Sequence, residues 1–137
     1  MSSADSVVAL VRSPALTDQV PYAYAAVVPA ARTVWTAGAC PLDDDGAVVA
    51  PGDVAAQARR VMDNLVTALD AAGAGLADVA RSTVYVASSD RADLVAAWDV
   101  VRAAFGDHDA PSTLLGVAVL GYPDQLVEVE AVAVLPT

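Results

Sequence analysis

The sequence predicts an α+β fold in which two helices cover one face of a mixed six-stranded sheet. Strand-like and helix-like segments follow one another in the order β, β, β, α, β, α, β, β. The 137 residues have the length of one domain and contain no repeat, low-complexity segment or linker, so we expect a single domain over residues 1–137. The closing strands carry apolar residues on both sides, which indicates that the second face of the sheet is also covered.

The first third of the chain is predicted to form strands. Alternating or β-branched residues mark three segments, at 7–12 ("VVALVR"), 22–29 ("YAYAAVVP") and 33–39 ("TVWTAGA"). Only the short connection "AAR" separates the second segment from the third, which is typical of a hairpin. Residues 40–53 carry Pro, Gly and Asp at close spacing and are predicted to be turn and loop.

Two amphipathic helices are predicted after residue 53. Apolar residues recur at three- and four-residue steps between Asp53 and Gly73, where the glycine can end the helix. Asp90 can cap a second helix that stops before Gly106. Between the helices, residues 79–86 alternate as a strand does.

The last two strands are predicted at residues 112–120 and 126–134. In the second of them, "LVEVEAVAV", side chains alternate between the two faces, so one face is wholly apolar. The other face begins with Glu128 and Glu130 and becomes apolar at Val132. This pattern suggests two carboxylates that open onto a cleft.

Composition excludes several classes of function. The net charge is −10, so we do not expect nucleic acid as a partner. All seven basic residues are arginine, and the absence of lysine excludes Schiff-base chemistry on a lysine amine. One cysteine and one histidine make neither an internal disulfide nor a credible zinc or Cys/His catalytic set. No apolar run approaches the roughly 18 residues of a membrane span, and we expect a cytoplasmic protein without cofactor.

The same composition points to self-association. Apolar residues make up 56% of the chain and charged residues only 18%, which leaves little polar material to cover a monomer. We therefore predict a closed homo-oligomer that covers the second face of the sheet.

Three longer segments carry a resemblance to a known family: "PYAYAAVV", "WTAGACPLDDDGAVVAPGDVAAQARRVMDNLVTALDAAGAGLADVARSTVYV" and "GVAVLGYPDQLVEVEAVAV". From about Pro21 to Val134 the chain resembles the Rid, or YjgF-type, reactive intermediate deaminases, once described as endoribonuclease L-PSP or translation inhibitors. The resemblance implies a chorismate-mutase-like fold and a homotrimer whose sheets form a central barrel, with a small-molecule cleft at each subunit interface. It also implies hydrolysis of imines and enamines derived from amino acids, without metal or organic cofactor.

The resemblance also implies roles for particular residues. Glu128 matches the glutamate that places the attacking water, and Tyr22 matches an aromatic residue of the cleft. The arginine that holds the substrate carboxylate falls on Ser112, or on Thr113 if the alignment slips by one. Because a hydroxyl offers one donor where guanidinium offers a charged fork, we expect weak binding of carboxylate-bearing imines.

Two further candidates stand where the sequence departs from the family pattern, namely Cys40 and Trp98. The predicted catalytic residues are therefore Glu128, Ser112 and Thr113. The predicted substrate-binding residues are Tyr22, Cys40 and Trp98.

Each candidate has a purely structural alternative. Glu128 and Glu130 could be solvated strand residues, and Cys40 a small buried hydrophobe, since no basic neighbour in the sequence would activate its thiol. Trp98 has the helical spacing of a core residue. His108 lies in an acidic loop and is expected to be solvated.

The leading function is hydrolysis of an imine or enamine that need not carry a carboxylate. A non-catalytic small-molecule-binding or regulatory protein of the same fold is the alternative, and an accessory role in a metabolic pathway is the third possibility.

Overall fold

Four strands form the main sheet of the computed structural model, which describes residues 6–15, 18–19, 21, 23, 25–28 and 31–136. Their order across the sheet is β3-β6-β4-β5. The central strand β6 pairs antiparallel with β3 and β4, whereas β4 and β5 are parallel, so the sheet is mixed. The bounds are Ala31–Trp35 for β3, Val79–Val86 for β4, Ser112–Gly116 for β5 and Val127–Pro136 for β6.

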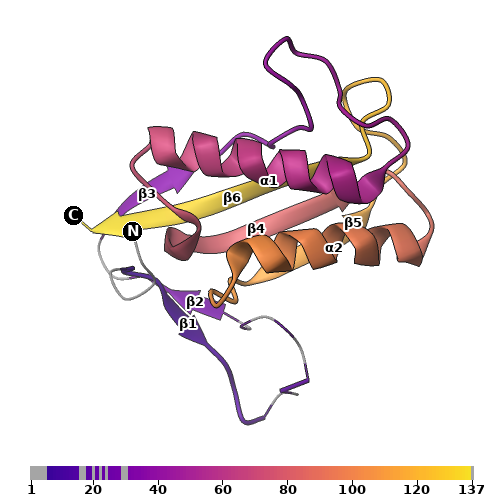
Figure 1. Cartoon of the computed structure of the whole chain (residues 1–137). Helices are drawn as coiled ribbons and strands as arrows, with labels where there is room; N and C mark the ends of the chain where they lie inside the picture. The colour runs from indigo at the N-terminus through magenta and orange to yellow at the C-terminus, as the bar shows by residue number, and fades with distance from the viewer. Residues whose placement is uncertain are drawn as a thin grey trace.

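Two helices lie side by side across one face of this sheet (Figure 1). Helix α1 (Val54–Ala71) begins at Asp53, whose side chain accepts a hydrogen bond from the Ala56 amide. Helix α2 (Arg91–Phe105) begins in the same way at Asp90 and ends at Gly106, which has positive φ. Both helices confirm the predicted periodicity and caps. A short 3-10 turn, η2 (Leu76–Asp78), leads from α1 into β4.

The other two described strands form a separate ribbon. Strand β1 (Ala9–Val11) pairs antiparallel with β2 (Ala25–Val27), apart from the main sheet. The described strands therefore form a two-stranded and a four-stranded sheet, and not the single six-stranded sheet that the sequence predicts.

The predicted hairpin between the second and third segments is also wrong. Strand β3 pairs with β6, in register from Ala31 opposite Pro136 to Trp35 opposite Val132. The ten-residue β6 offers β3 a longer ladder than the three-residue β2 can. Strands β2 and β3 are therefore close in sequence but belong to different sheets.

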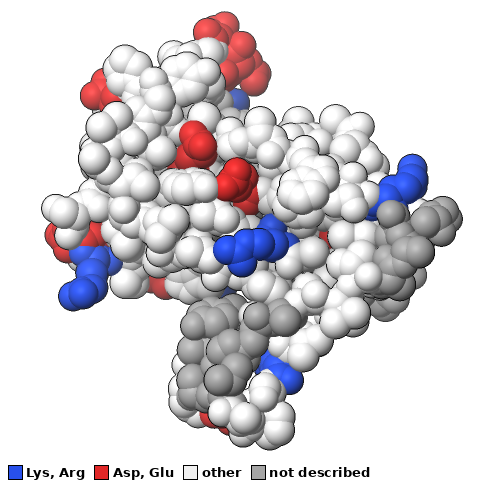
Figure 2. Space-filling view, turned by 180° about the vertical axis from the view of Figure 1, so that it is seen from behind, with Lys and Arg blue, Asp and Glu red and all other residues white. Residues whose placement is uncertain are grey.

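The core lies between the helices and the sheet. Alternate residues of β6, from Val127 to Leu135, are buried together with the apolar stripe of α1. The opposite face, which we call the open face, carries the residues of β6 that begin with Glu128 and Glu130. In the view from behind the helices, acidic and basic side chains lie near each other in its middle (Figure 2). No described helix is long and apolar enough to cross a membrane.

Candidate functional site

Glu128 lies half-buried near the start of β6, on the open face. The Gln125 side-chain amide donates to its Oε1 at 3.2 Å, and the Cys40 thiol donates to the same oxygen at 3.4 Å. Gln125 is itself buried and also donates to the Val127 carbonyl. Two neutral donors therefore orient the carboxylate, and no described cation pairs with it.

A glycine makes room for this carboxylate. The segment after β3 joins β6 by a bridge in which Ala39 and Val129 exchange both backbone hydrogen bonds, at 2.7 and 3.2 Å. This bridge brings Gly38 directly against Glu128, where an added Cβ would overlap the side chain. Any larger residue at Gly38 would force the carboxylate into another rotamer.

Cys40 is a protonated donor in this arrangement. Burial, together with the hydrogen bond and the negative charge of Glu128, raises the pKa of the Cys40 thiol to about 11. A thiolate nucleophile at neutral pH is therefore disfavoured, in line with the absence of a basic neighbour.

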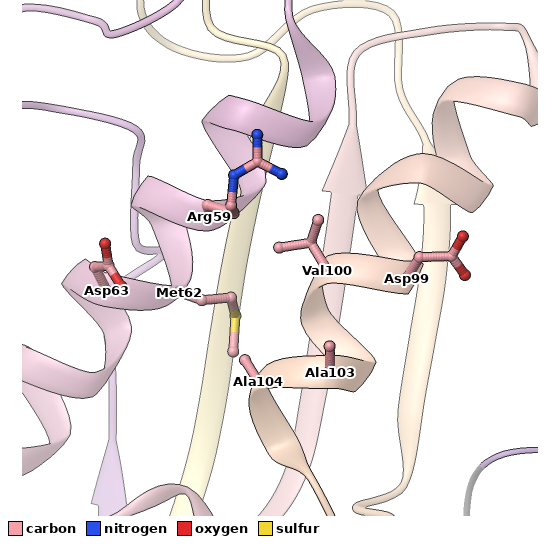
Figure 3. A pocket seen from close by; sticks show the side chains of 7 residues that line it. All are labelled: Arg59, Met62, Asp63, Asp99, Val100, Ala103 and Ala104. Carbon is pink, nitrogen blue, oxygen red and sulfur yellow. The ribbon is translucent and has the colours of Figure 1, made fainter.

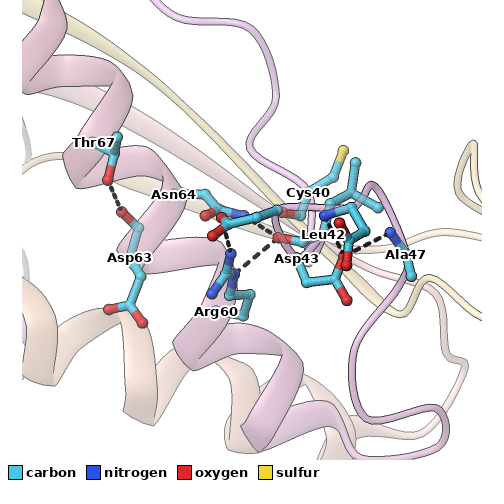
Figure 4. Close-up of polar contacts among 10 residues, drawn as sticks. Cys40, Leu42, Asp43, Ala47, Arg60, Asp63, Asn64 and Thr67 are labelled. Atoms are coloured by element: carbon cyan, nitrogen blue, oxygen red, sulfur yellow. Dashed lines mark hydrogen bonds and ion pairs between the residues drawn. The ribbon is translucent and has the colours of Figure 1, made fainter.

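Helix α1 holds the loop that carries Cys40 (Figure 4). The Asn64 side chain donates to the carbonyls of Cys40 and Leu42, at 2.8 and 3.0 Å. Arg60 donates to the Leu42 carbonyl at 2.8 Å and forms an ion pair with Asp44 at 3.3 Å. The loop is thus tied to a rigid element, which fixes the thiol relative to β6.

A cavity of about 440 Å³ adjoins Gly38 and Cys40, between the segment after β3 and helix α1. Its wall is completed by Trp35, Asn64 and Tyr122. This volume is in the range of small-molecule sites. A larger cavity of about 580 Å³ lies between α1 and α2, lined by Met62 and Val100 and by charged residues (Figure 3). Glu128 is not among the residues that line it.

Ser112 does not lie with Glu128. Its hydroxyl bonds to the hydroxyl of the buried Ser82 and donates to the Ala110 carbonyl at 3.1 Å, on the face of the sheet that the helices cover. Trp98 lies on the same side, half-buried against the core, and lines a very small cavity with Ser112. The pleat of β5 therefore turns Ser112 away from the carboxylate, and Trp98 belongs to helix α2 on that same covered side.

Thr113 takes the opposite direction and faces the open side. Its hydroxyl accepts a hydrogen bond from Arg81 of β4 at 2.7 Å. The guanidinium of Arg81 thus lies beside Thr113, one of the two hydroxyl residues predicted for the site. The remaining predicted binding residue, Tyr22, lies outside the described residues.

Sequence reasoning did not select four residues that lie around the two glutamates or beside their strand, namely Gly38, Arg81, Tyr85 and Gln125. Tyr85 is opposite Glu128 in the ladder, and its hydroxyl donates to Glu130. That hydrogen bond raises the pKa of Tyr85, with burial and the two glutamate charges adding to it. The alternation of residues 79–86 could have placed Arg81 and Tyr85 on one face, but only the strand register shows that this face is shared with the glutamates.

His108 is buried and not solvated, contrary to the expectation from its acidic loop. Only 7% of it is exposed, and its Nε2 bonds to the Val79 carbonyl at 2.7 Å. The histidine thus joins the loop after α2 to the start of β4. Among the described residues, no group of three or more His, Cys, Asp or Glu side chains could hold a metal ion.

Comparison with known proteins gives consistent matches. Residues 15–135 match the family Endoribonuclease L-PSP. The chain is 33% identical over 121 residues to the 3-aminoacrylate deaminase RutC of Acinetobacter baylyi, covering 86% of this chain and 94% of that protein. It is 36% identical over 101 residues to the 2-iminobutanoate/2-iminopropanoate deaminase of Escherichia coli K12, covering 72% and 77%. Among solved structures, YyfB from Yersinia pestis, described as a protein of unknown function of the conserved Rid family, aligns with a TM-score of 0.88 and 31% identity over 94% and 99% of the two chains.

Proposed function

Because the chain belongs to the Rid (YjgF-type) family, also described as Endoribonuclease L-PSP, we propose that it hydrolyses a small reactive imine or enamine to a carbonyl compound and ammonia. The observation that carries this proposal is the carboxylate of Glu128, which accepts hydrogen bonds from Gln125 and Cys40. Cys40 and Gly38, which both adjoin this carboxylate, line a cavity of about 440 Å³. The two relatives named as deaminases support the same reaction class.

The proposed chemistry needs little from the protein. An imine carbon is electrophilic, so a positioned water molecule can add to it while Glu128 accepts the water proton. Return of that proton to nitrogen gives a neutral carbinolamine. Glu128 then moves the hydroxyl proton of the carbinolamine to nitrogen, so that the C–N bond breaks, the C=O bond forms and ammonia leaves. The net reaction adds one water and releases one ammonia, with no change of oxidation state and no covalent intermediate on the enzyme.

Neutral hydroxyls are proposed to orient the substrate. Thr113 faces the open side, and the phenol of Tyr22 is proposed to line the cleft mouth. A substrate held by hydroxyl donors and by Glu128 need not carry a carboxylate. Ser112, which is turned toward α2, is left out of this set.

The site is proposed to be completed by neighbouring copies of the chain in a cytoplasmic homotrimer. The open face supports this, because it exposes Trp35 to 76% and Leu115 to 43%, more apolar surface than a sheet in water usually carries. Copies closed around a common axis would cover that face and place a cleft at each interface.

The test is hydrolysis of imines generated in solution by an amino acid oxidase, followed as ammonia and carbonyl release above the uncatalysed rate. Glu128→Gln is expected to lower the rate by about 100-fold or more, since it removes the group that takes the proton. Gly38→Ala should lower it as well, because the new methyl group displaces the carboxylate while leaving the core intact.

Asp99→Asn, which makes the same chemical change on the outer side of α2, is the matched control and should keep the wild-type rate. Saturable binding of ligand without any turnover would contradict the proposal and favour a binding protein. An unchanged rate in Glu128→Gln would remove Glu128 from the mechanism.

A further inference from the structure

The cavity of about 580 Å³ between α1 and α2 is a groove on the outer side of the two helices. Met62 of α1 and Val100 of α2 line it, and Ala103 and Ala104 leave open the space that larger side chains would fill. The helices cover the face of the sheet opposite to the open face (Figure 1). The proposed trimer, which covers the open face, therefore leaves this groove, which we call the helix groove, accessible to a partner.

Acidic residues flank the helix groove on both sides. Figure 3 shows Asp63 of α1 and Asp99 of α2 on opposite sides of it, with Arg59 at one end. All three residues are exposed, and none of them forms an ion pair with a residue that the structure describes. The helix groove is therefore an apolar strip between two acidic margins whose carboxylates have no ion-pair partner in the described part of the chain.

The strip continues along α1, away from Arg59. Val66 lies four residues after Met62 and is exposed, so it extends the apolar strip by about one helical turn. Asp70 lies seven residues after Asp63 on the same side of the helix and is also exposed, so it extends the acidic margin. Both the apolar strip and its acidic border therefore follow the helix axis, as a site for another helix requires.

We propose that the helix groove binds an amphipathic helix of a partner protein, whose apolar stripe is flanked on both sides by lysine or arginine. The stripe packs between the two helices, on Met62 and Val100. The flanking cations reach over the margins to Asp63 and Asp99, as charged residues do beside the seam of a coiled coil. The net charge of −10 also favours encounter with a basic partner.

Arg59 sets the direction of the docked helix. The last carbonyl groups of a helix have no partner within the helix and carry a partial negative charge, so a cation beside them is stabilising. The C-terminus of the docked helix therefore lies at Arg59. Figure 3 shows that α1 and α2 both run away from this end, so the docked helix is antiparallel to them.

The test uses the intact protein and synthetic helical peptides of about 18 residues. The lysine peptide has a leucine stripe flanked by lysines, and the glutamate peptide has glutamate in place of each lysine. Fluorescence anisotropy measures binding at physiological ionic strength, which screens long-range attraction. The lysine peptide should bind saturably at micromolar concentrations. The glutamate peptide, and a scrambled lysine peptide that forms no stripe, should each bind at least about tenfold more weakly.

Charge reversal then assigns the acidic margins. Asp63→Lys combined with Asp99→Lys should weaken binding of the lysine peptide by about tenfold or more and strengthen binding of the glutamate peptide. Asp18→Lys combined with Asp45→Lys makes the same change of net charge at exposed positions that do not line the groove, and should bind the lysine peptide as the wild type does. Ala103→Trp fills the groove from an exposed position and should abolish binding.

The direction of the docked helix has its own test. The lysine peptide with a free C-terminal carboxylate should bind about threefold more tightly than its amidated form, because the carboxylate lies beside Arg59. This difference should disappear in Arg59→Gln. Arg91→Gln, at the exposed start of α2, is the matched control and should keep it. An equal difference in wild type and Arg59→Gln would refute the direction.

Three results would overturn the assignment of the groove. The first is no saturable binding of the lysine peptide. The second is equal binding of its scrambled form, or equal effects of the two double substitutions, which would mean that net charge alone attracts the peptide. The third is association between trimers that Ala103→Trp abolishes, which would give the groove to a second copy of this chain. The proposal goes beyond imine hydrolysis and does not depend on it, because binding is measured without turnover.

Discussion

The contact between Cys40 and Glu128 determines the chemistry of both side chains. A thiol that donates to a carboxylate in a partly buried place cannot lose its proton without placing two negative charges side by side. Cys40 is therefore a neutral donor that holds the Glu128 carboxylate in place. The raised pKa argues against the nucleophile that the sequence left open, and Cys40 is a half-buried hydrogen-bond donor and not a fully buried apolar residue.

This account predicts slow alkylation of Cys40. At pH 8 its reaction with iodoacetamide should be at least about tenfold slower than that of a free cysteine, because a pKa of about 11 leaves little thiolate. Glu128→Gln should accelerate the reaction, since it removes the charge that holds the proton on sulfur. Denatured protein is the control and should react at the rate of free cysteine. A native rate equal to that control would contradict the raised pKa.

The same pair has a consequence for stability at alkaline pH. The pKa of Cys40 in the folded protein lies above the 9.0 of an unperturbed thiol, so between these values the folded protein keeps a proton that the unfolded chain loses. This contribution to stability is fully present below pH 9 and is lost as the pH rises toward 11.

At the scale of elements, one buried side chain joins helix α1 to the loop before β6. Gln57 is fully buried, and its amide donates to the carbonyls of Ala50 and Asp124, at 3.3 and 2.9 Å. Its oxygen accepts from the Leu126 amide at 2.8 Å. Gln57 thus fixes the loop before β6. This loop carries Gln125, whose side chain orients Glu128.

Gln57→Ala should therefore destabilise the protein by about 2–3 kcal/mol, because it leaves buried backbone groups without partners. Urea denaturation measures this difference. Thr67→Ala is a control on the exposed side of the same helix and should change the stability by less than about 0.5 kcal/mol. Equal effects of the two substitutions would show that the Gln57 contacts add little.

Strand pairing is the feature of these elements that local reasoning could not supply. The helices and their caps follow from nearby residues, and they were predicted with nearly the observed bounds. The partner of β3 is β6, about a hundred residues later, and no pattern near residues 31–35 distinguishes it from β2. Pairing depends on which strand the packed helices place alongside, which is a long-range property.

At the scale of the whole molecule, the open face exposes apolar residues that a stable protein usually covers. One side of β6 is buried beneath the helices, whereas the other combines Glu128, Glu130 and the exposed apolar residues Trp35 and Leu115. Exposure of this apolar surface to water is unfavourable, and we propose that a second copy of the chain covers it.

Sedimentation tests this proposal. The wild-type protein should sediment as a trimer, and Leu115→Glu should shift it toward the monomer, because the new charge would be buried in the interface. Val95→Glu is the matched control, since Val95 is 53% exposed on α2, and it should leave the trimer intact. A well-folded wild-type monomer at working concentrations would refute the assembly.

The sequence alone determined the class of the fold, the two capped helices, the two-faced last strand and the family resemblance, because these depend on periodicity and on neighbouring residues. Only the tertiary structure decided that Cys40, Gly38 and Gln125 surround Glu128, that Thr113 and not Ser112 faces the open side, and that Arg81 and Glu130 share a cavity. Such juxtapositions arise from the register between distant strands, and a shift of one residue would turn every side chain of a strand to the other face.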